Sequence, residues 1–77
     1  MNAKLRGLRG RDVVRALERA RFVLKRVKGS HHILVHPDDT LRRAIVPAHA
    51  GKTIKPGTMH AILKQAGLSE EEFEALL

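Results

Sequence analysis

The sequence predicts a two-layer α+β domain in which helices cover one face of a three-stranded antiparallel sheet. Residues 11–21 and 56–66 repeat apolar side chains at the spacing of amphipathic helices. Three short segments between them lack that period and are rich enough in branched apolar residues for strands. The connections between these segments are short, which indicates an antiparallel meander. Both apolar helix stripes then need one sheet face to bury against.

The first helix is expected over residues 11–21, after a flexible basic arm over residues 1–10. Its apolar residues fall on one side of the helix: Val13, Val14, Ala16, Leu17 and Ala20. Charged residues occupy the opposite side, and only Arg21 breaks the division. Asp12 lies in the first turn, where its charge suits the helix dipole.

The three strands are expected over residues 22–28, 31–36 and 42–46. Gly29 and Ser30 form a tight turn between the first two strands. Residues 37–40, Pro-Asp-Asp-Thr, have the composition of a second turn. Pro47 is expected to stop the third strand, because it has no N–H to donate.

A loop over residues 47–55 leads to the second helix. Pro56 suits its first position, where the missing N–H costs nothing, and Gly67 ends it. Residues 68–77 predict a short final helix with Ser69 as cap. Glu72 closes a capping box with that serine, and Leu68 and Phe73 stand at the positions of a hydrophobic staple.

The composition excludes several classes of protein. Seventy-seven residues suffice for one domain and leave little room for a buried cofactor site. The absence of cysteine excludes disulfides, thiolate zinc sites and thiol nucleophiles. No apolar run approaches the length of a membrane span, and the basic start lacks the apolar stretch of a signal peptide. We therefore expect a cytoplasmic protein.

Positive charge dominates the chain, whose formal net charge is +7. Residues 1–30 hold ten basic and two acidic residues, whereas residues 69–77 hold four glutamates and no basic residue. Such a field attracts polyanions, of which nucleic acid is the commonest, although a solvated basic surface is the alternative. With two Phe and no Trp or Tyr, the chain cannot build a base-stacking platform. Nucleic acid would be held through phosphate contacts and shape.

Five histidines are the candidate chemical groups: His31, His32, His36, His49 and His60. On the second strand, His32 and His36 share one face with Leu34, and alternation alone does not say whether that face is buried. These two histidines would lie roughly 13 Å apart, too far to share a metal ion. Ser30 lacks the setting of a nucleophile, since a sequence neighbour cannot serve as its base.

A histidine just after a tight turn in a basic domain suffices for cleaving RNA. The histidine can take the proton of the 2′-hydroxyl, and nearby cations can stabilise the charge that develops on the phosphate. The alternative for each histidine is a surface or structural residue.

Three stretches of the chain carry specific motifs. They read Gly-Ser-His-His-Ile over residues 29–33, IVPAHAGKTIKPGT over residues 45–58, and ILKQAGLS over residues 62–69. In this order and spacing they closely resemble the HicA (YcfA-like) toxin family, small mRNA interferases of bacteria and archaea that pair with HicB antitoxins. The resemblance covers about residues 8–77. It implies a fold similar to a double-stranded-RNA-binding domain, α-β-β-β-α, in agreement with the order given above.

The resemblance also implies roles for individual residues. The second histidine of the G-S-x-H pattern is catalytic in the family, which points to His32. Gly29 forms the turn that presents it, Ser30 and His31 support it, and His31 ranks below His32. The second motif places His49 at the mouth of the site, as a second proton-transfer or phosphate group.

Five basic residues are expected to bind RNA: Lys28, Lys52, Lys55, Arg15 and Arg19. Lys52 and Lys55 flank the start of the second helix, whose free N–H groups favour an anion. The resemblance implies an mRNA substrate and a HicB-type antitoxin. We expect no metal or other cofactor, and we expect an acidic face of the antitoxin to cover the surface from His32 to Lys52. Two alternatives remain, a noncatalytic binder of structured RNA and an inactive toxin relic kept as a complex partner.

Overall fold

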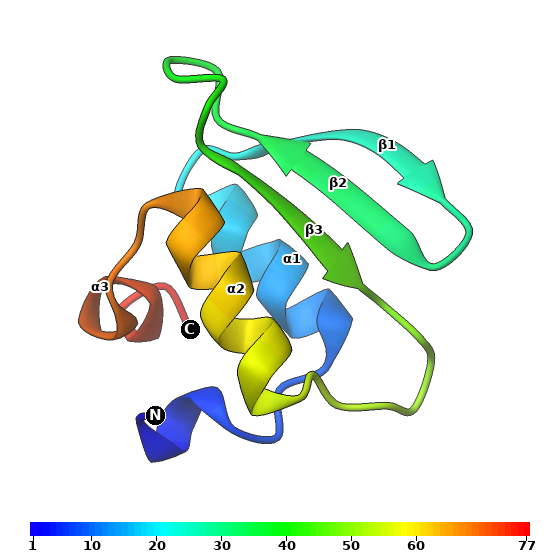
Figure 1. The fold of residues 1–77 in the computed structure, drawn as a ribbon, viewed down its shortest axis with the longest axis vertical. Helices are drawn as coiled ribbons and strands as arrows, with labels where there is room; N and C mark the ends of the chain where they lie inside the picture. The colour runs from blue at the N-terminus through cyan, green and yellow to red at the C-terminus, as the bar shows by residue number, and fades with distance from the viewer.

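An antiparallel sheet of three strands in the order β1-β2-β3 forms one layer of the protein (Figure 1). In the computed structural model, which describes residues 1–77, the strands are β1 (Val23–Lys28), β2 (His31–Val35) and β3 (Arg43–Pro47). A bulge between Leu24 and Arg26 shifts the register of β1 against β2. The predicted meander of three strands is therefore confirmed.

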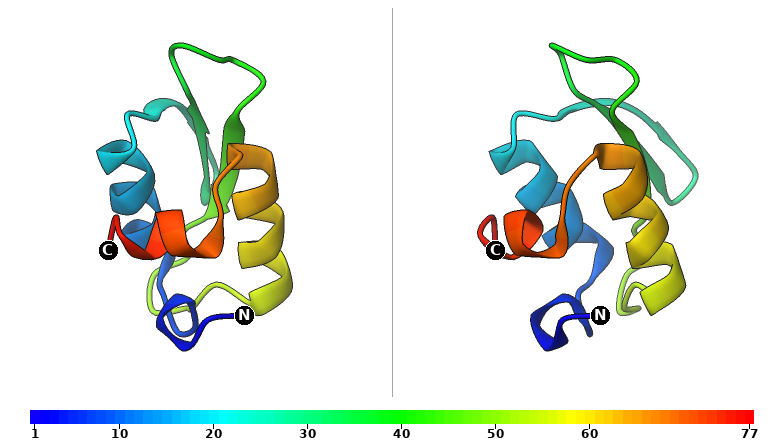
Figure 2. Two further views of the ribbon diagram at one scale, coloured as in Figure 1. Left: turned by 90° about the vertical axis from the view of Figure 1, so that its left-hand side faces the viewer. Right: turned by 60° about the vertical axis from the view of Figure 1, so that its left-hand side comes forward.

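The second layer consists of the helices α1 (Gly10–Arg19) and α2 (Pro56–Ala66), which lie on the same side of the sheet (Figure 2). A short helix α3 (Glu70–Glu74) follows α2, and a 3-10 helix η1 (Ala3–Leu5) precedes α1. The predicted α+β class with the α-β-β-β-α order is confirmed. None of these helices combines the length and apolar character that crossing a membrane would require.

The two faces of the sheet differ in what covers them. Leu34, Ala44 and Val46 point toward the helices and are fully buried. On the opposite face no helix covers Ile45, which is 45% exposed. The face of β2 that carries Leu34 also carries His32 and His36, so the structure decides the question that sequence alternation left open.

Both phenylalanines lie in the apolar core, where Phe22 is 3% and Phe73 0% exposed. Neither ring can therefore stack on a nucleic-acid base. The edge of the buried His36 ring meets Phe22 with ring centres 5.2 Å apart, and the Arg42 guanidinium lies over the same phenylalanine. These contacts give His36 a structural role in the fold.

Several boundaries differ from prediction by one to three residues. Helix α1 ends two residues early because Arg21 has a φ of 74°, outside the helical region. Pro47 was expected to lie just beyond β3 and to stop it. It is instead the last residue of that strand and pairs with His31. The Ala48 N–H donates to Ser30 across the sheet, so the nitrogen of Pro47 faces the open edge.

The third helix is shorter than the predicted residues 68–77, but its start is as expected. The Ser69 hydroxyl accepts the Glu72 N–H, and the Glu72 carboxylate accepts the Ser69 N–H at 2.8 Å. These two hydrogen bonds confirm the predicted capping box. They also hold the pKa of Glu72 below its ordinary value, with the backbone bond from Ser69 as the main cause.

The first ten residues differ from the flexible arm that we expected. Leu5 is 1% exposed and belongs to the core, and Leu8 packs against that core. The Ile54 N–H donates to the Leu8 carbonyl, and Lys4 forms an ion pair with Glu74. The basic residues led us to expect an arm, but the apolar side chains between them anchor the segment to the core.

Candidate active site

A two-residue turn places His32 at one end of the sheet. Gly29 has a φ of 59°, a left-handed conformation that glycine adopts without strain, as the turn prediction requires. His31 and His32 begin β2 directly after this turn. Because side chains alternate along a strand, His32 points toward the helix layer and is half-buried.

Ser30 joins this turn to the loop that follows β3. Its carbonyl accepts the Ala48 N–H at 2.8 Å and lies 3.3 Å from Nδ1 of His32. Its hydroxyl lies 3.0 Å from Nε2 of His49. One serine therefore contacts both histidines, one through its backbone and the other through its side chain.

The contact with Ser30 determines which nitrogen of His32 is free. A carbonyl oxygen can only accept, so Nδ1 of His32 donates the hydrogen bond. In the neutral ring, the other nitrogen, Nε2, then carries the lone pair. His32 is thus held in the form in which Nε2 can receive a proton.

An open pocket of about 400 Å³ brings the two histidines together with the start of α1. Its lining consists of Arg9, Gly10, Arg11, His32, Ala48, His49, Ala50 and Gly51. No carboxylate is among these residues, whereas two arginines are. The pocket therefore combines proton-transfer groups with positive charge, which suits a phosphate ester.

Gly10 allows α1 to reach this pocket. A Cβ atom at Gly10 would lie 2.5 Å from the Cα of Ala48 and 2.6 Å from the Pro47 carbonyl oxygen. Only a residue without a side chain lets the helix approach the loop after β3 so closely.

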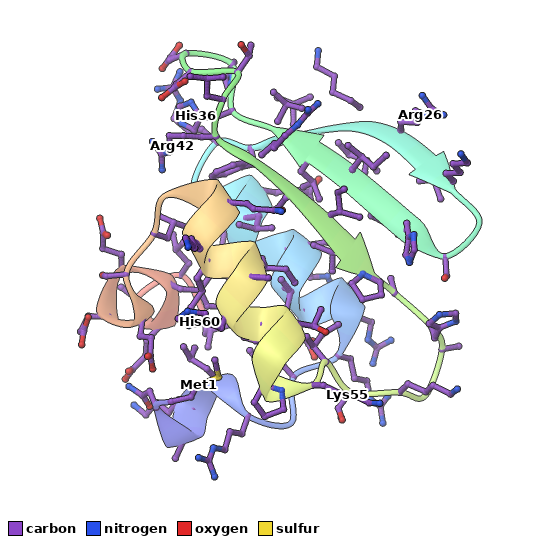
Figure 3. All side chains as sticks on the ribbon, viewed as in Figure 1. Met1, Arg26, His36, Arg42, Lys55 and His60 are labelled. Atoms are coloured by element: carbon purple, nitrogen blue, oxygen red, sulfur yellow. The ribbon has the colours of Figure 1, made fainter.

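A second hollow of about 240 Å³ adjoins the first and shares His49 with it. Lys52, Lys55 and Thr58 are among its lining residues. Lys55 lies at the start of α2, where no side chain caps the helix (Figure 3). Both predicted lysines therefore lie beside the histidine pocket.

The other predicted basic residues lie elsewhere. Lys28 pairs with His31, and both are exposed on the outer face of the sheet, away from His32. Arg15 and Arg19 line a different hollow, on α1. The Arg19 guanidinium donates to the Leu76 carbonyl at 2.7 Å. The structure thus brings neither these three basic residues nor His31 into the pocket.

Arg9 and Arg11 are the pocket residues that the sequence analysis did not single out. Arg9 falls within the expected basic arm, and Arg11 falls on the charged side of the expected first helix. Their position depends on the contact of Gly10 with the loop after β3, which has no local signature in the sequence.

The remaining histidines lie outside the pocket. Figure 3 shows His36 at the end of the sheet opposite Lys55, and His60 on α2. Nowhere do three or more His, Asp or Glu side chains gather in a way that could hold a metal ion. The candidate chemistry therefore concentrates at His32 and His49.

The fold and this pocket define a small basic α+β domain whose α-β-β-β-α fold is like that of double-stranded-RNA-binding domains, with two histidines at one end of its sheet. The family model described as "HicA toxin of bacterial toxin-antitoxin" matches residues 10–68. The match spans more than half of the chain, which therefore belongs to the HicA toxin family and has an antitoxin as its partner. No curated protein sequence gives a significant match.

Proposed function

We propose that the protein is an endoribonuclease, an mRNA interferase toxin that cleaves RNA without a metal ion and is inhibited by a HicB-type antitoxin. The observation that carries this proposal is the carboxylate-free pocket in which His32 and His49 are both tied to Ser30. Membership in the HicA family supports it, because HicA toxins cleave mRNA.

In the proposed reaction, His32 acts as the general base. Nε2 of His32 takes the proton of an RNA 2′-hydroxyl, and the oxygen attacks the adjacent phosphorus. The bond from phosphorus to the 5′-oxygen of the next nucleotide breaks. The products are a 2′,3′-cyclic phosphate and a free 5′-hydroxyl. Every atom of this step comes from the RNA, with the protein moving protons only.

His49 is the proposed general acid. When protonated, it can donate to the departing 5′-oxygen while His32 holds the proton of the 2′-hydroxyl. The Ser30 hydroxyl, 3.0 Å from His49 Nε2, would orient the ring. Gly29 and Ser30 therefore support catalysis by positioning the two histidines.

The antitoxin is proposed to inhibit by covering the surface from His32 to Lys52. No acidic side chain lines either hollow on this surface, so an acidic partner face would meet lysine and arginine there and no like charge. In the complex, His32 should be protected from diethyl pyrocarbonate, which modifies accessible histidines. Modification of His32 at the same rate in free and bound toxin would rule out this mode of inhibition.

The experiment that tests the catalytic proposal is cleavage of a mixed RNA in EDTA by the wild type, His32→Ala and His60→Ala. We expect cleavage by the wild type and by His60→Ala, which loses an exposed histidine outside the pocket. We expect none by His32→Ala. Cleavage by His32→Ala at the wild-type rate would refute the assignment, and a strict need for added metal would refute the mechanism.

Noncatalytic binding of structured RNA is the second candidate function. It is favoured by the hollow at the start of α2, where Lys52 and Lys55 lie beside an uncapped helix end that can bind phosphate. If neither the wild type nor His32→Ala cleaves RNA while both retard it in a gel, this function replaces the first. The histidines would then be residues of the fold and the surface.

A further inference from the structure

Two arginines at the start of α1 line the same pocket as the histidines. Arg9 and Arg11 are both exposed, and neither guanidinium takes part in an ion pair. The two ion pairs in the protein are instead Lys4 with Glu74 and Arg21 with Asp38. Both guanidinium groups are therefore free to bind an anion that enters the pocket.

The backbone that carries these arginines is held in place on both sides. The Arg9 N–H donates to the Asp12 carboxylate at 2.9 Å, and Arg9 forms an isolated antiparallel bridge with Thr53. Next to it, Gly10 is buried against Pro47 and Ala48. Two flexible side chains thus extend from a fixed segment beside His32 and His49.

Arginine is suited to neutralising the negative charge on a phosphate, a role that no other residue of the pocket has been given. Its planar guanidinium can donate two parallel hydrogen bonds to phosphate oxygens, and its charge persists at every accessible pH. Attack on phosphorus increases the negative charge on the two nonbridging oxygens. His32 and His49 account for the two protons in the proposed reaction, but neither neutralises that charge throughout the step.

We propose that Arg9 and Arg11 bind the scissile phosphate of RNA in the histidine pocket and stabilise the charge on its nonbridging oxygens. The inference rests on the proposed ribonuclease function, because it assigns residues to the same reaction. It differs from nonspecific attraction, in which any surface cation would contribute equally.

The test compares the double variant Arg9→Ala/Arg11→Ala with Arg43→Ala. Arg43 is an exposed arginine on the outer face of β3 and lines neither hollow. The first readout is the single-turnover cleavage rate at saturating RNA. We expect a loss of about 100-fold or more in the double variant, the size seen when a group that stabilises transition-state charge is removed. Arg43→Ala should cleave within about twofold of the wild type, since a distant surface charge acts only through screened attraction.

Arg9→Lys/Arg11→Lys separates charge from geometry. Lysine keeps the positive charge but lacks the planar fork. This variant should bind RNA as the wild type does and still cleave at a reduced rate. A cleavage rate for Arg9→Ala/Arg11→Ala equal to that of Arg43→Ala would overturn the proposal.

The second readout is binding of a 2′-O-methyl RNA, which lacks the attacking hydroxyl and cannot be cleaved. This binding readout tests the phosphate site even if the wild type does not cleave RNA, so failure of the ribonuclease proposal and failure of this inference can be told apart. Weaker binding by Arg9→Ala/Arg11→Ala than by Arg43→Ala would then support a phosphate site in the pocket. Equal binding by the two variants would overturn it.

Discussion

Replacing Gly10 with alanine should destabilise the protein, although alanine is the better helix former. Gly10 is the first residue of α1, and its backbone packs on the loop after β3. Helix propensity alone predicts a gain of up to about 1 kcal/mol for this substitution. Packing predicts a loss, so the sign of the measured change separates the two effects.

The magnitude follows from the contacts that the new methyl group would make. It would lie 2.5 Å from the Cα of Ala48, 2.6 Å from the Pro47 carbonyl oxygen and 2.8 Å from the Cβ of Ala48. None of these atoms is the end of a flexible side chain, so backbone must move. Overpacking of this kind costs about 1–3 kcal/mol. A domain of this size loses about 4–8 °C in Tm per kcal/mol.

The assay is urea unfolding of the wild type, Gly10→Ala and Gly57→Ala. Gly57 lies in the first turn of α2, and a Cβ there would meet no atom within 4 Å. Gly57→Ala should therefore stabilise the protein by about 0.4–1 kcal/mol, by restricting the unfolded chain. The two variants make the same chemical change at two helix starts and should shift the midpoint in opposite directions.

A Gly10→Ala protein as stable as the wild type would refute the reasoning. It would mean that α1 can withdraw from the loop after β3 at no cost. The close approach that places Arg9 and Arg11 in the pocket would then not be required by the fold.

Three further predictions concern α3 and the RNA surface. Phe73→Ala should cost about 3–5 kcal/mol in urea unfolding, because its fully buried ring leaves a cavity, and a loss below about 1 kcal/mol would contradict its place in the core. The pKa of Glu72 is lowered in the folded protein. Its ionised carboxylate therefore stabilises the folded state above the ordinary pKa of 4.5, and this stabilisation is lost as the pH falls through the lower folded pKa. The difference in urea midpoint between the wild type and Glu72→Gln should therefore shrink below pH 4.5, and a pH-independent difference would refute this coupling. Lys55→Ala should lower the slope of log binding constant against log salt for RNA by about 1, and an unchanged slope would exclude a phosphate contact.

Local patterns in the sequence predicted most of the fold. The turn at Gly29, the start of α2 at Pro56 and the capping box at Ser69 depend on neighbouring residues alone, and all three are confirmed. The ends of α1 and β3 differ from the prediction because they depend on tertiary context. Pro47, for example, fits inside its strand only because β3 is an edge strand.

The candidate site was predictable only in part. The motifs drew attention to Ser30, His32 and His49, which the structure brings together. No pattern indicated Arg9 or Arg11, because they join the site through contacts between distant segments. The alternation of side chains along β2 likewise did not show which face of the strand is buried, since each face carries histidine and aliphatic residues.

The contact between η1 and α3 joins segments that leave the ribosome far apart in time. The Asn2 N–H donates to the Glu70 carboxylate, and Leu5 shares the core with Phe73. A nascent chain that has emerged only as far as α2 therefore holds an unfinished core, because Phe73 and the Glu70 carboxylate that accepts the Asn2 N–H are still missing. Synthesis must pass residue 74 before the domain can close, so each molecule of this toxin completes its fold only after the message encoding the whole domain has been read.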